Sequence, residues 1–550
     1  MSPVDVFQVK SERLFPNIKP EEQVVALSLL DATTVDFSAS SVIWLCEKPD
    51  THPDFDLSGH LRESLQLTLD AYPQWTGLLK GISTLNPDKL PRETAHFAPH
   101  ARRYGRVYAH FGTSQDPGVE FVTARSTATL NTLCPAARVK NEPIYDRQKV
   151  SLANLVSSAT ITNAFRPNLP DESGQLQPLM AIQLTHLACG GFALAAKIGH
   201  PMSDIQSLVS FMKDWASVSR WILSGSSGPP PELKPNFDPS QLDKMASGDI
   251  NAKAPDPAIL DQITQLPLHR YDWWISTEEC PWEVLVPDPY RNKPIQPIGK
   301  SMPWSEWDHE SPVSHYVVHL THEQVELIFE DATKSTSHPT DAVRISRHDA
   351  VLAHAWACIA HARNLQDDSD PVHCDLTFGS RGAFGLDSSF VGSPIMMVDI
   401  EMTGAGLCSP QIPEEQRRGA IAQKIRTTIN QINRPVAMGA HLHSVAYETC
   451  PQRIWQAFVG RRHILVTSWA RAGVYELDFG LSSTPIIRYV EPVMVDMDGI
   501  VVINDAPPPK GVNISDGQSW TVHGVDISMH LRAQDMERLI KDPLLLPRVK

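Results

Sequence analysis

The segment from Leu179 to Trp215 carries two apolar runs that are separated by Gly190 and Gly191. Paired glycines supply the positive φ angles of a tight chain reversal, so these runs predict a buried β-hairpin. Beyond the second run, apolar residues recur at the spacing of one helix face: Ile205, Leu208, Val209 and Met212. The segment therefore predicts a hairpin whose second strand leads directly into a helix.

His200 stands where the predicted strand ends, and Asp204 follows four residues later, where it or Ser203 can cap the helix. The H-x-x-x-D spacing alone is weak, because about one such pair is expected by chance among 22 histidines. His52 and Asp56 share this spacing in a polar loop, and we interpret them as solvated. His200 differs because an apolar strand brings it into a turn, although a core histidine bonded to a backbone carbonyl is the alternative.

Length and composition limit the class of protein. A chain of 550 residues exceeds one ordinary core, so at least two large domains are expected. A content of 42% hydrophobic and 20% charged residues is typical of a soluble globular protein. The net charge of −15 and the lack of a Lys- or Arg-rich stripe argue against nucleic acid as a partner.

The eight cysteines are scattered and form no C-x-x-C pair, which favours free thiols over a zinc site or a disulfide scaffold. We therefore expect no bound metal. The first residues lack the apolar core of a signal peptide, and no apolar run approaches membrane-spanning length. A cytoplasmic protein without a membrane span is the resulting prediction.

Strand and helix patterns alternate along the chain, which predicts the α/β (α+β) class in two layered halves. The first half, residues 1–223, has predicted strands at 41–46, 76–79, 107–111 and 119–123, and a helix from Leu61 that ends at Pro73. The second half, residues 315–550, has these predicted strands: 316–320, 375–378, 395–400, 464–467, 500–503 and 526–531. Its predicted helices are 323–332, 346–363, 414–432 and 533–541.

Residues 224–314 lie between the halves and are predicted to be a crossover. Residues 224–254 are rich in Ser, Gly and Pro, which is the composition of a linker. Residues 270–310 carry many prolines and five tryptophans: Trp273, Trp274, Trp282, Trp304 and Trp307. We favour a loop that these rings anchor to the surface; the alternative is that some of them wall a pocket for an acceptor.

Six motifs follow one another in the order of a known family. They are L-S-L-L-D at 27–31, L-R-E-S-L to G-L-L at 61–79, C-G-G with H-P-M-S-D at 189–204, S-R-H-D-A-V-L-A-H-A-W at 346–356, G-S-R with F-V-G-S at 379–393, and T-S-W-A-R with D-F-G at 467–480. Over nearly the whole chain they resemble the BAHD acyltransferase family, in its fungal secondary-metabolite branch of trichothecene acetyltransferase-like proteins. The resemblance implies two chloramphenicol acetyltransferase-like domains with mixed sheets, and an active-site channel between them.

The resemblance also implies the chemistry. An acyl group, acetyl by default, passes from coenzyme A to a hydroxyl of a small-molecule secondary metabolite, and acylation of nitrogen stays open. His200 is then the general base. Asp204 pairs with an arginine, for which Arg381 is the candidate; an exposed loop charge is the alternative for Arg381. Acyl-CoA is the co-substrate, no cofactor is bound permanently, and a monomer is expected.

Further site residues follow from the resembled motifs. Thr467, Ser468 and Trp469 are candidate donors to an oxyanion or contacts to substrate, unless they only cap and pack a strand end. Asp478 and Gly480 of D-F-G are expected to support the site structurally. Two features depart from the family: D-F-G runs into L-S-S instead of W-G, and an isoleucine follows Asp204 where glycine is common.

Three alternatives concern the partners and the class. Arg461 and Arg462 are candidates for the coenzyme's phosphates, although we prefer a solvated charged face. A condensation-type domain would take its acyl group from a carrier protein, but Gly199 before His200 argues against it. A degenerate fold that serves as a binding protein or a non-acylating catalyst is the other alternative, and the intact His200 and Asp204 argue against that.

Overall fold

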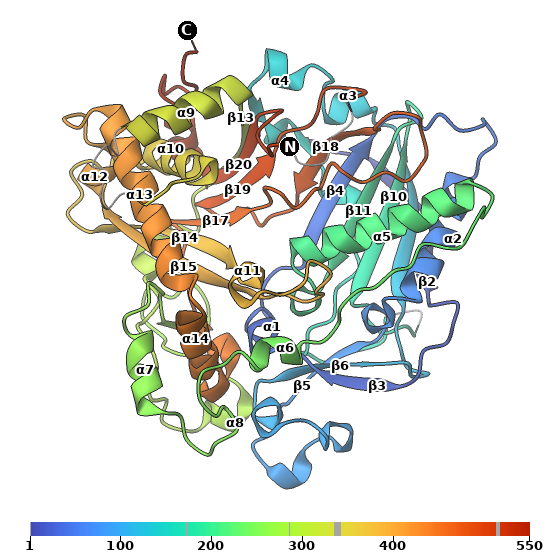
Figure 1. Ribbon diagram of the computed structural model, residues 1–550, viewed down its shortest axis with the longest axis horizontal. Helices are drawn as coiled ribbons and strands as arrows, with labels where there is room; N and C mark the ends of the chain where they lie inside the picture. The colour runs from blue at the N-terminus through green and yellow to red at the C-terminus, as the bar shows by residue number, and fades with distance from the viewer. Residues whose placement is uncertain (1, 172–173, 285, 335–342, 513–517, 550) are drawn as a thin grey trace.

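The computed structural model describes residues 2–171, 174–284, 286–334, 343–512 and 518–549. Two large mixed β-sheets with flanking helices form the two halves of the molecule (Figure 1). The predicted α/β class with two halves is therefore confirmed.

A six-stranded sheet forms the first half. In spatial order its strands are β18 (Ile487–Pro492), β4 (Ser40–Cys46), β11 (Phe192–Ile198), β10 (Met180–Leu187), β7 (Val119–Ser126) and β2 (Val6–Leu14). Strands β10 and β11 are the predicted hairpin: they pair antiparallel, and Gly190 between them has a φ of 84°. Glycine adopts this angle without the clash that a Cβ would create, which explains the tight reversal.

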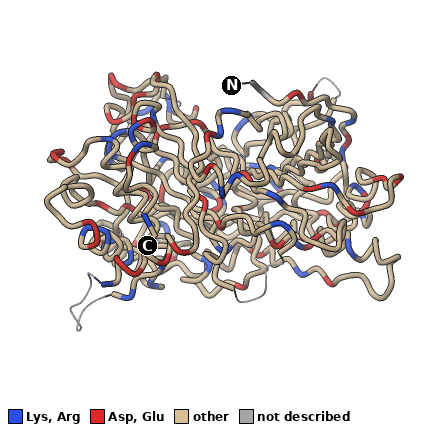
Figure 2. The backbone as a smooth tube through the Cα atoms, turned by 90° about the horizontal axis from the view of Figure 1, so that it is seen from above, with Lys and Arg blue, Asp and Glu red and all other residues tan. Residues whose placement is uncertain are grey.

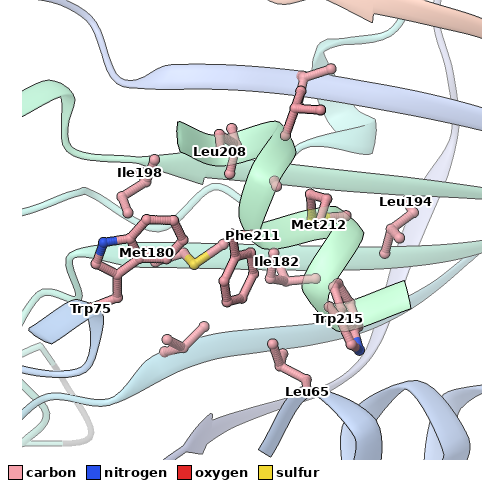
Figure 3. Packing of buried hydrophobic residues seen from close by; sticks show 14 of the residues in the cluster. Leu65, Trp75, Met180, Ile182, Leu194, Ile198, Leu208, Phe211, Met212 and Trp215 are labelled. Carbon is pink, nitrogen blue, oxygen red and sulfur yellow. The ribbon is translucent and has the colours of Figure 1, made fainter. Parts of the chain in front are cut away.

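Helix α5 (Ile205–Leu223) lies across this sheet beside α2 (Leu57–Leu69) (Figure 1). The helix predicted from Leu61 begins at Leu57 and ends at Leu69, because Pro73 opens a separate 3-10 turn. Figure 3 shows how the apolar face of α5 meets the hairpin and α2: Leu208, Phe211, Met212 and Trp215 pack among Leu65, Trp75, Met180, Ile182, Leu194 and Ile198. Each such side chain contributes about 1.5–3 kcal/mol on burial, so the start of α5 is firmly placed.

A seven-stranded sheet forms the second half. In spatial order its strands are β15 (Ile395–Thr403), β14 (Pro371–Gly379), β17 (His463–Ser468), β19 (Ile500–Asp505), β20 (Val525–Arg532), β13 (Val313–Leu320) and β8 (Ile144–Asp146). The helices that pack on it are α9 (His322–Lys334), α10 (Arg347–Ala362), α13 (Glu414–Ile432) and α15 (Ala533–Leu539). Every strand and helix predicted for this half is confirmed within a few residues.

Each sheet takes one strand from the other half of the chain. Strand β18 comes late in the sequence but pairs antiparallel with β4 at the edge of the first sheet (Figure 1). Strand β8 comes from the first half and pairs with β13 of the second sheet. The division at residues 223 and 315 therefore describes chain order, and the two halves interlock across it.

The crossover between the halves is built of short elements. They are α6 (Ser240–Asp243), α7 (Pro257–Ile263), β12 (Tyr271–Asp272) and α8 (Asp288–Arg291). Strand β12 pairs with β16 (Ile454–Trp455), and α7 packs on α14 (Pro435–Tyr447), a helix that the sequence did not predict. The crossover is thus fastened to the second half.

Smaller elements complete the fold. A three-stranded sheet contains β3 (Gln23–Ala26), β6 (Val107–Phe111) and β5 (Leu78–Gly81), and a two-stranded one contains β1 (Ser2–Pro3) and β9 (Val150–Ser151). The short helices are α1 (Leu29–Thr33), α3 (Leu130–Leu133), α4 (Arg138–Asn141), α11 (Arg381–Phe384) and α12 (Gly404–Cys408). Of these, α1 and α11 carry residues of the candidate site.

Charges of both signs are spread along the whole chain (Figure 2). All eight cysteines, each within the described ranges, are free thiols. Among the described residues, no helix has the length and hydropathy that crossing a membrane requires.

Candidate active site

His200 lies in the turn that joins β11 to α5, as the sequence predicts. Residues His200–Met202 form a single 3-10 turn with Pro201 near its start, and α5 begins at Ile205. Asp204 is the N-cap of α5, because its carboxylate accepts a hydrogen bond of 3.0 Å from the Ser207 amide. Of the two capping candidates, Ser203 and Asp204, the structure selects Asp204.

Asp204 and Arg381 form a buried ion pair. Arg381 Nη1 donates to Asp204 Oδ2, and Nη2 donates to Oδ1 at 2.9 Å and to Ser207 Oγ at 2.7 Å. Both side chains are 8% exposed. Arg381 begins α11, directly after β14, so this pair joins the second sheet to the start of α5 in the first half. The expected partner of Asp204 is the one that the structure contains.

The imidazole of His200 contacts a serine from the second half. Its Nδ1 lies 2.9 Å from Ser393 Oγ. The Ser393 amide donates to Asp31 Oδ1 at 2.6 Å, and Asp31 also forms a capping box with Ser28 at the start of α1. Burial raises the pKa of Asp31 to about 6, although the hydrogen bonds from Ser28 and Ser393 oppose this. His200 is thus oriented by residues of the L-S-L-L-D and F-V-G-S motifs.

Neither Ser393 nor Asp31 had been assigned a role from the sequence. Each lies within a motif that carried the family resemblance, and that position was the only sequence signal for it. The contact of Ser393 with His200, and that of Asp31 with Ser393, depends on the packing of three distant segments, which no local pattern reports.

Burial lowers the pKa of His200 below its ordinary value, and the nearby charge of Asp204 opposes the shift. The ring of Phe37 packs edge-on to the imidazole at 5.3 Å between centroids, and Trp455 packs against Phe37 at 4.9 Å. A histidine in this state is neutral at pH 7 and can accept a proton.

His200 opens onto a cavity of about 1380 Å³. All five tryptophans of the crossover line it: Trp273, Trp274, Trp282, Trp304 and Trp307. Four of them pack on one another, with ring centroids 5.7 Å apart for Trp273 and Trp304 and 5.1 Å apart for Trp282 and Trp304, and Trp274 packs on Tyr290. From the sequence we preferred a loop that these rings anchor to the surface. The structure instead favours the alternative, in which the rings wall a pocket.

Thr467, Ser468 and Trp469 lie at the end of β17 and line the same cavity, as does Arg381. The Trp469 amide donates to the Ile503 carbonyl at 2.9 Å, which fixes the chain where β17 ends. The structure thus brings these three candidates into the pocket of His200.

The D-F-G residues lie outside this cavity and pack against α5. Asp478 Oδ1 accepts a hydrogen bond of 2.8 Å from the Gly480 amide, and Gly480 has a φ of 74°. Phe479 packs edge-on to Trp215 at 5.2 Å, and Arg220 donates to the Asp478 carbonyl. Because these contacts hold a loop of the second half on α5, they fit the structural support expected of Asp478 and Gly480.

A second cavity, of about 1280 Å³, lies beside the D-F-G loop. Its cationic lining residues are Lys213, Arg220, Arg344, Arg347, Arg426 and Arg471, and its acidic ones are Glu476, Asp478 and Asp505. Arg471 also lines the cavity of His200, and it has a φ of 69°, which is unusual for a residue with a side chain. The two cavities are therefore neighbours at Arg471.

Arg461 and Arg462 are occupied by acidic partners. Arg462 forms ion pairs with Glu306, Asp368 and Asp370, and Arg461 Nη2 lies 3.0 Å from Asp368. Neither arginine is among the described residues that line the two large cavities. The structure thus fits the preferred solvated charged face for Arg461, which is 50% exposed, whereas Arg462 is 17% exposed and held in an ion-pair network.

Comparison with known proteins agrees with this geometry. A model of the "Transferase family" matches residues 113–266. Acyltransferase AFT15-1 of Alternaria alternata is 22% identical, over 92% of this chain and 90% of its own. Acyltransferase abl6 of Leptosphaeria maculans is 23% identical, over 98% and 97%.

Two solved structures share the fold. F. graminearum TRI101, complexed with coenzyme A and T-2 mycotoxin, has a TM-score of 0.63 at 14% identity and covers 95% of this chain and 98% of its own. Vinorine synthase has a TM-score of 0.54 at 15% identity, with 97% and 96% covered. These likenesses show that the chain has the two-domain α/β fold of both structures. The chain is similar to a transferase-family model and to two fungal acyltransferases, which bears out the resemblance to the BAHD acyltransferases that the six motifs carry.

Proposed function

We propose that this protein transfers an acyl group from acyl-CoA to a hydroxyl of a small-molecule acceptor, with His200 as the general base. The observation that carries the proposal is the contact of His200 Nδ1 with Ser393 Oγ, at 2.9 Å, beside a tryptophan-lined cavity. When Ser393 accepts from the Nδ1–H group, the lone pair of the imidazole resides on Nε2. A neutral imidazole in this tautomer is the form that a base requires.

The reaction then needs one proton relay and no covalent enzyme intermediate. As the acceptor oxygen attacks the thioester carbonyl carbon, its proton passes to Nε2 of His200. The tetrahedral adduct collapses with cleavage of the C–S bond, and the proton passes from Nε2 to the departing sulfur. The products are the ester and the free coenzyme A thiol, and His200 returns to its neutral form.

Asp204 acts in this mechanism by position. Both of its carboxylate oxygens are engaged, by Arg381 and by the Ser207 amide, so it holds the turn that presents the imidazole. Thr467, Ser468 and Trp469 offer hydroxyl and indole donors on the pocket wall, and we assign to them the stabilisation of the oxyanion.

We assign the coenzyme's phosphates to the cation-lined cavity. The chain carries a net charge of −15, so an anionic donor requires a local concentration of Lys and Arg. Six such residues line the second cavity: Lys213, Arg347 and Arg426 also pair with carboxylates, and the others are Arg220, Arg344 and Arg471. Arginine suits phosphate because its guanidinium donates two parallel hydrogen bonds. Because Arg471 lines both cavities, a donor that spans them can bring its thioester to His200.

The acceptor is expected to be bulky and largely apolar, because tryptophan rings form much of the wall of its cavity. TRI101 is solved with T-2 mycotoxin, which agrees with a large small-molecule acceptor. Acetyl is the acyl group that we test first. Action as a cytoplasmic monomer stays a prediction.

Calorimetric titration of coenzyme A and acetyl-CoA into the purified protein tests the donor. Micromolar binding, on the order of −8 kcal/mol, is expected. Release of free thiol is then measured with a panel of hydroxyl and amine acceptors, with His200→Ala as the control. Failure to bind coenzyme A at millimolar concentration, or transfer only from a carrier-bound thioester, would overturn the proposal.

A further inference from the structure

Three histidines and two aspartates gather on the second sheet, outside the motifs and the proposed catalytic machinery. His373 and Asp375 lie on β14, Asp399 on β15 and His463 on β17, and His269 comes from the crossover just before β12. Their side chains are between 0% and 14% exposed. We call these five residues the His/Asp cluster.

The nitrogen and oxygen atoms of the cluster that could bind a metal face one another. His269 Nε2 lies 3.1 Å from Asp375 Oδ1 and 3.4 Å from Asp399 Oδ1. His463 Nδ1 lies 3.3 Å from Asp375 Oδ2, and His373 Nδ1 lies 2.9 Å from Asp399 Oδ1. Ligands that are about 2.0–2.2 Å from a tetrahedral zinc ion stand about 3.3–3.6 Å from one another. The cluster therefore has nearly the spacing of a metal-ligand set.

Hydrogen bonding leaves part of the cluster unsatisfied. His269 Nε2 and Asp375 Oδ1 are both buried, and within the described residues neither has a hydrogen-bond partner of normal geometry, although they are only 3.1 Å apart. Buried polar atoms without a partner are rare in native proteins and call for a group that satisfies them. A cation between the two atoms would do so.

We propose that the His/Asp cluster binds one divalent transition-metal ion, and that this ion is zinc. Imidazole nitrogens and carboxylate oxygens are the ligands that zinc takes, and two carboxylates balance its charge. Two groups of potential ligands share His269: one with His373 and Asp399, the other with Asp375 and His463, with the donor atoms of each group within 4.8 Å of one another.

The surroundings suit a buried metal. The Phe458 amide donates to Asp375 Oδ2 at 2.8 Å and so orients this carboxylate. The ring of Tyr271 stacks on His269 at 4.7 Å, and Phe458 packs edge-on to His463 at 5.6 Å. Outer hydrogen bonds and an apolar shell of this kind fix ligands and keep water from the ion.

The position of the cluster gives the metal a structural role. The residues that lie two positions from the cluster along β14, β15 and β17, on the side of His200, line the cavity of His200. They are Thr377, Met397 and Leu465. On the other side, His269 precedes β12, which leads to Trp273 and Trp274 of the cavity wall. A zinc ion held by His269 and by either pair of strand residues thus clips the tryptophan-rich crossover to the sheet that forms the cavity floor.

The test is zinc binding by the full-length protein. Chelator-treated protein is titrated with zinc against a chromophoric competitor, cobalt(II) is added separately to record the visible bands of a tetrahedral site, and metal content is measured after dialysis. The matched control is His530→Ala, because His530 is also a buried histidine of this sheet that contacts an aspartate, Asp496 at 2.9 Å. The cluster variants are His269→Ala and His463→Ala, with His373→Gln as a milder change.

Wild type and His530→Ala are expected to bind about one equivalent of zinc and to gain thermal stability from it. Loss of an outer partner costs roughly 10–100-fold in metal affinity, so loss of a ligand in His269→Ala or His463→Ala is expected to cost at least 100-fold. If wild type binds no stoichiometric zinc, the cluster is only a hydrogen-bonded network of histidines and aspartates, and the proposal is wrong. Equal binding by wild type and the cluster variants would overturn it as well. Because the wild-type titration decides by itself, a variant that fails to fold leaves the test intact.

Discussion

Ser393 Oγ lies 2.9 Å from Nδ1 of His200, and the two residues come from opposite halves of the molecule, 193 positions apart. The Ser393 amide is held in turn by Asp31, and Arg381 from the same half holds Asp204. The turn that presents the imidazole is therefore set by contacts between the halves. Its geometry depends on how the two sheets interlock.

Substitution of Ser393 tests whether this contact fixes the tautomer of His200. Ser393→Ala removes the hydroxyl, and because one hydrogen bond contributes about 1 kcal/mol, kcat is expected to fall about 5–10-fold. Coenzyme binding by calorimetry should stay unchanged. Ser389→Ala in the same loop is the control. An unaltered kcat in Ser393→Ala would show that the contact does not serve catalysis.

His200→Ala removes the proposed base. General-base catalysis contributes about 10²–10⁴-fold, so kcat/KM is expected to fall by that factor while circular dichroism and the melting temperature stay near wild type. His52→Ala is the matched control, because it has the same H-x-x-x-D spacing on a side chain that is 78% exposed. Full activity in His200→Ala, or an equal loss in His52→Ala, would remove the assignment.

The parts of the site that depend on local sequence could be predicted. A glycine pair and a change of apolar period are local signals, and they placed His200 and Asp204 between β11 and α5. Helix α14 was missed because its side chains are buried almost all round, so its sequence shows no amphipathic period.

The remaining features depend on long-range contacts, which no local pattern reports. The pairing of β18 with β4 joins segments more than 400 residues apart. Ser393 gains its role only when the F-V-G-S loop reaches His200. The His/Asp cluster combines four segments that share no metal-binding spacing, so a cysteine count could not reveal it.

The Asp204–Arg381 pair is expected to contribute to stability. Asp204→Asn leaves the charge of Arg381 buried without a counter-charge, which costs about 3–5 kcal/mol. A fall in the melting temperature is therefore expected, and a double variant in which apolar residues replace both partners should recover much of it. Glu330→Gln is the control, because its pair with Lys334 is more than 60% exposed on both sides and contributes about 0–1 kcal/mol. An unchanged melting temperature in Asp204→Asn would contradict the pairing.

The pH dependence of activity follows from the lowered pKa of His200. The base must be neutral, so kcat/KM is expected to rise with pH through a midpoint below the ordinary value of about 6.5 and to be level above it. Below a pH of about 6.5, His200 binds a proton in the unfolded chain more readily than in the folded state. His200 therefore also makes the free energy of unfolding fall as the pH drops. A pH–rate profile checks the sign, and a midpoint above 7 would contradict it.

Arg471 lies where the two cavities meet, and its guanidinium is expected to bind a phosphate of the coenzyme. A charge-assisted hydrogen bond contributes about 1.5–3 kcal/mol, so Arg471→Gln should raise the KM for acetyl-CoA roughly 10–100-fold and leave the KM for the acceptor unchanged. Arg461→Gln is the control, because Arg461 pairs with Asp368 and is not among the described lining residues of either large cavity. A short thioester such as acetyl-N-acetylcysteamine has no phosphates, so Arg471→Gln and wild type should use it equally well. A loss of the same size with this thioester would mean that Arg471 shapes the passage to His200 and does not bind phosphate.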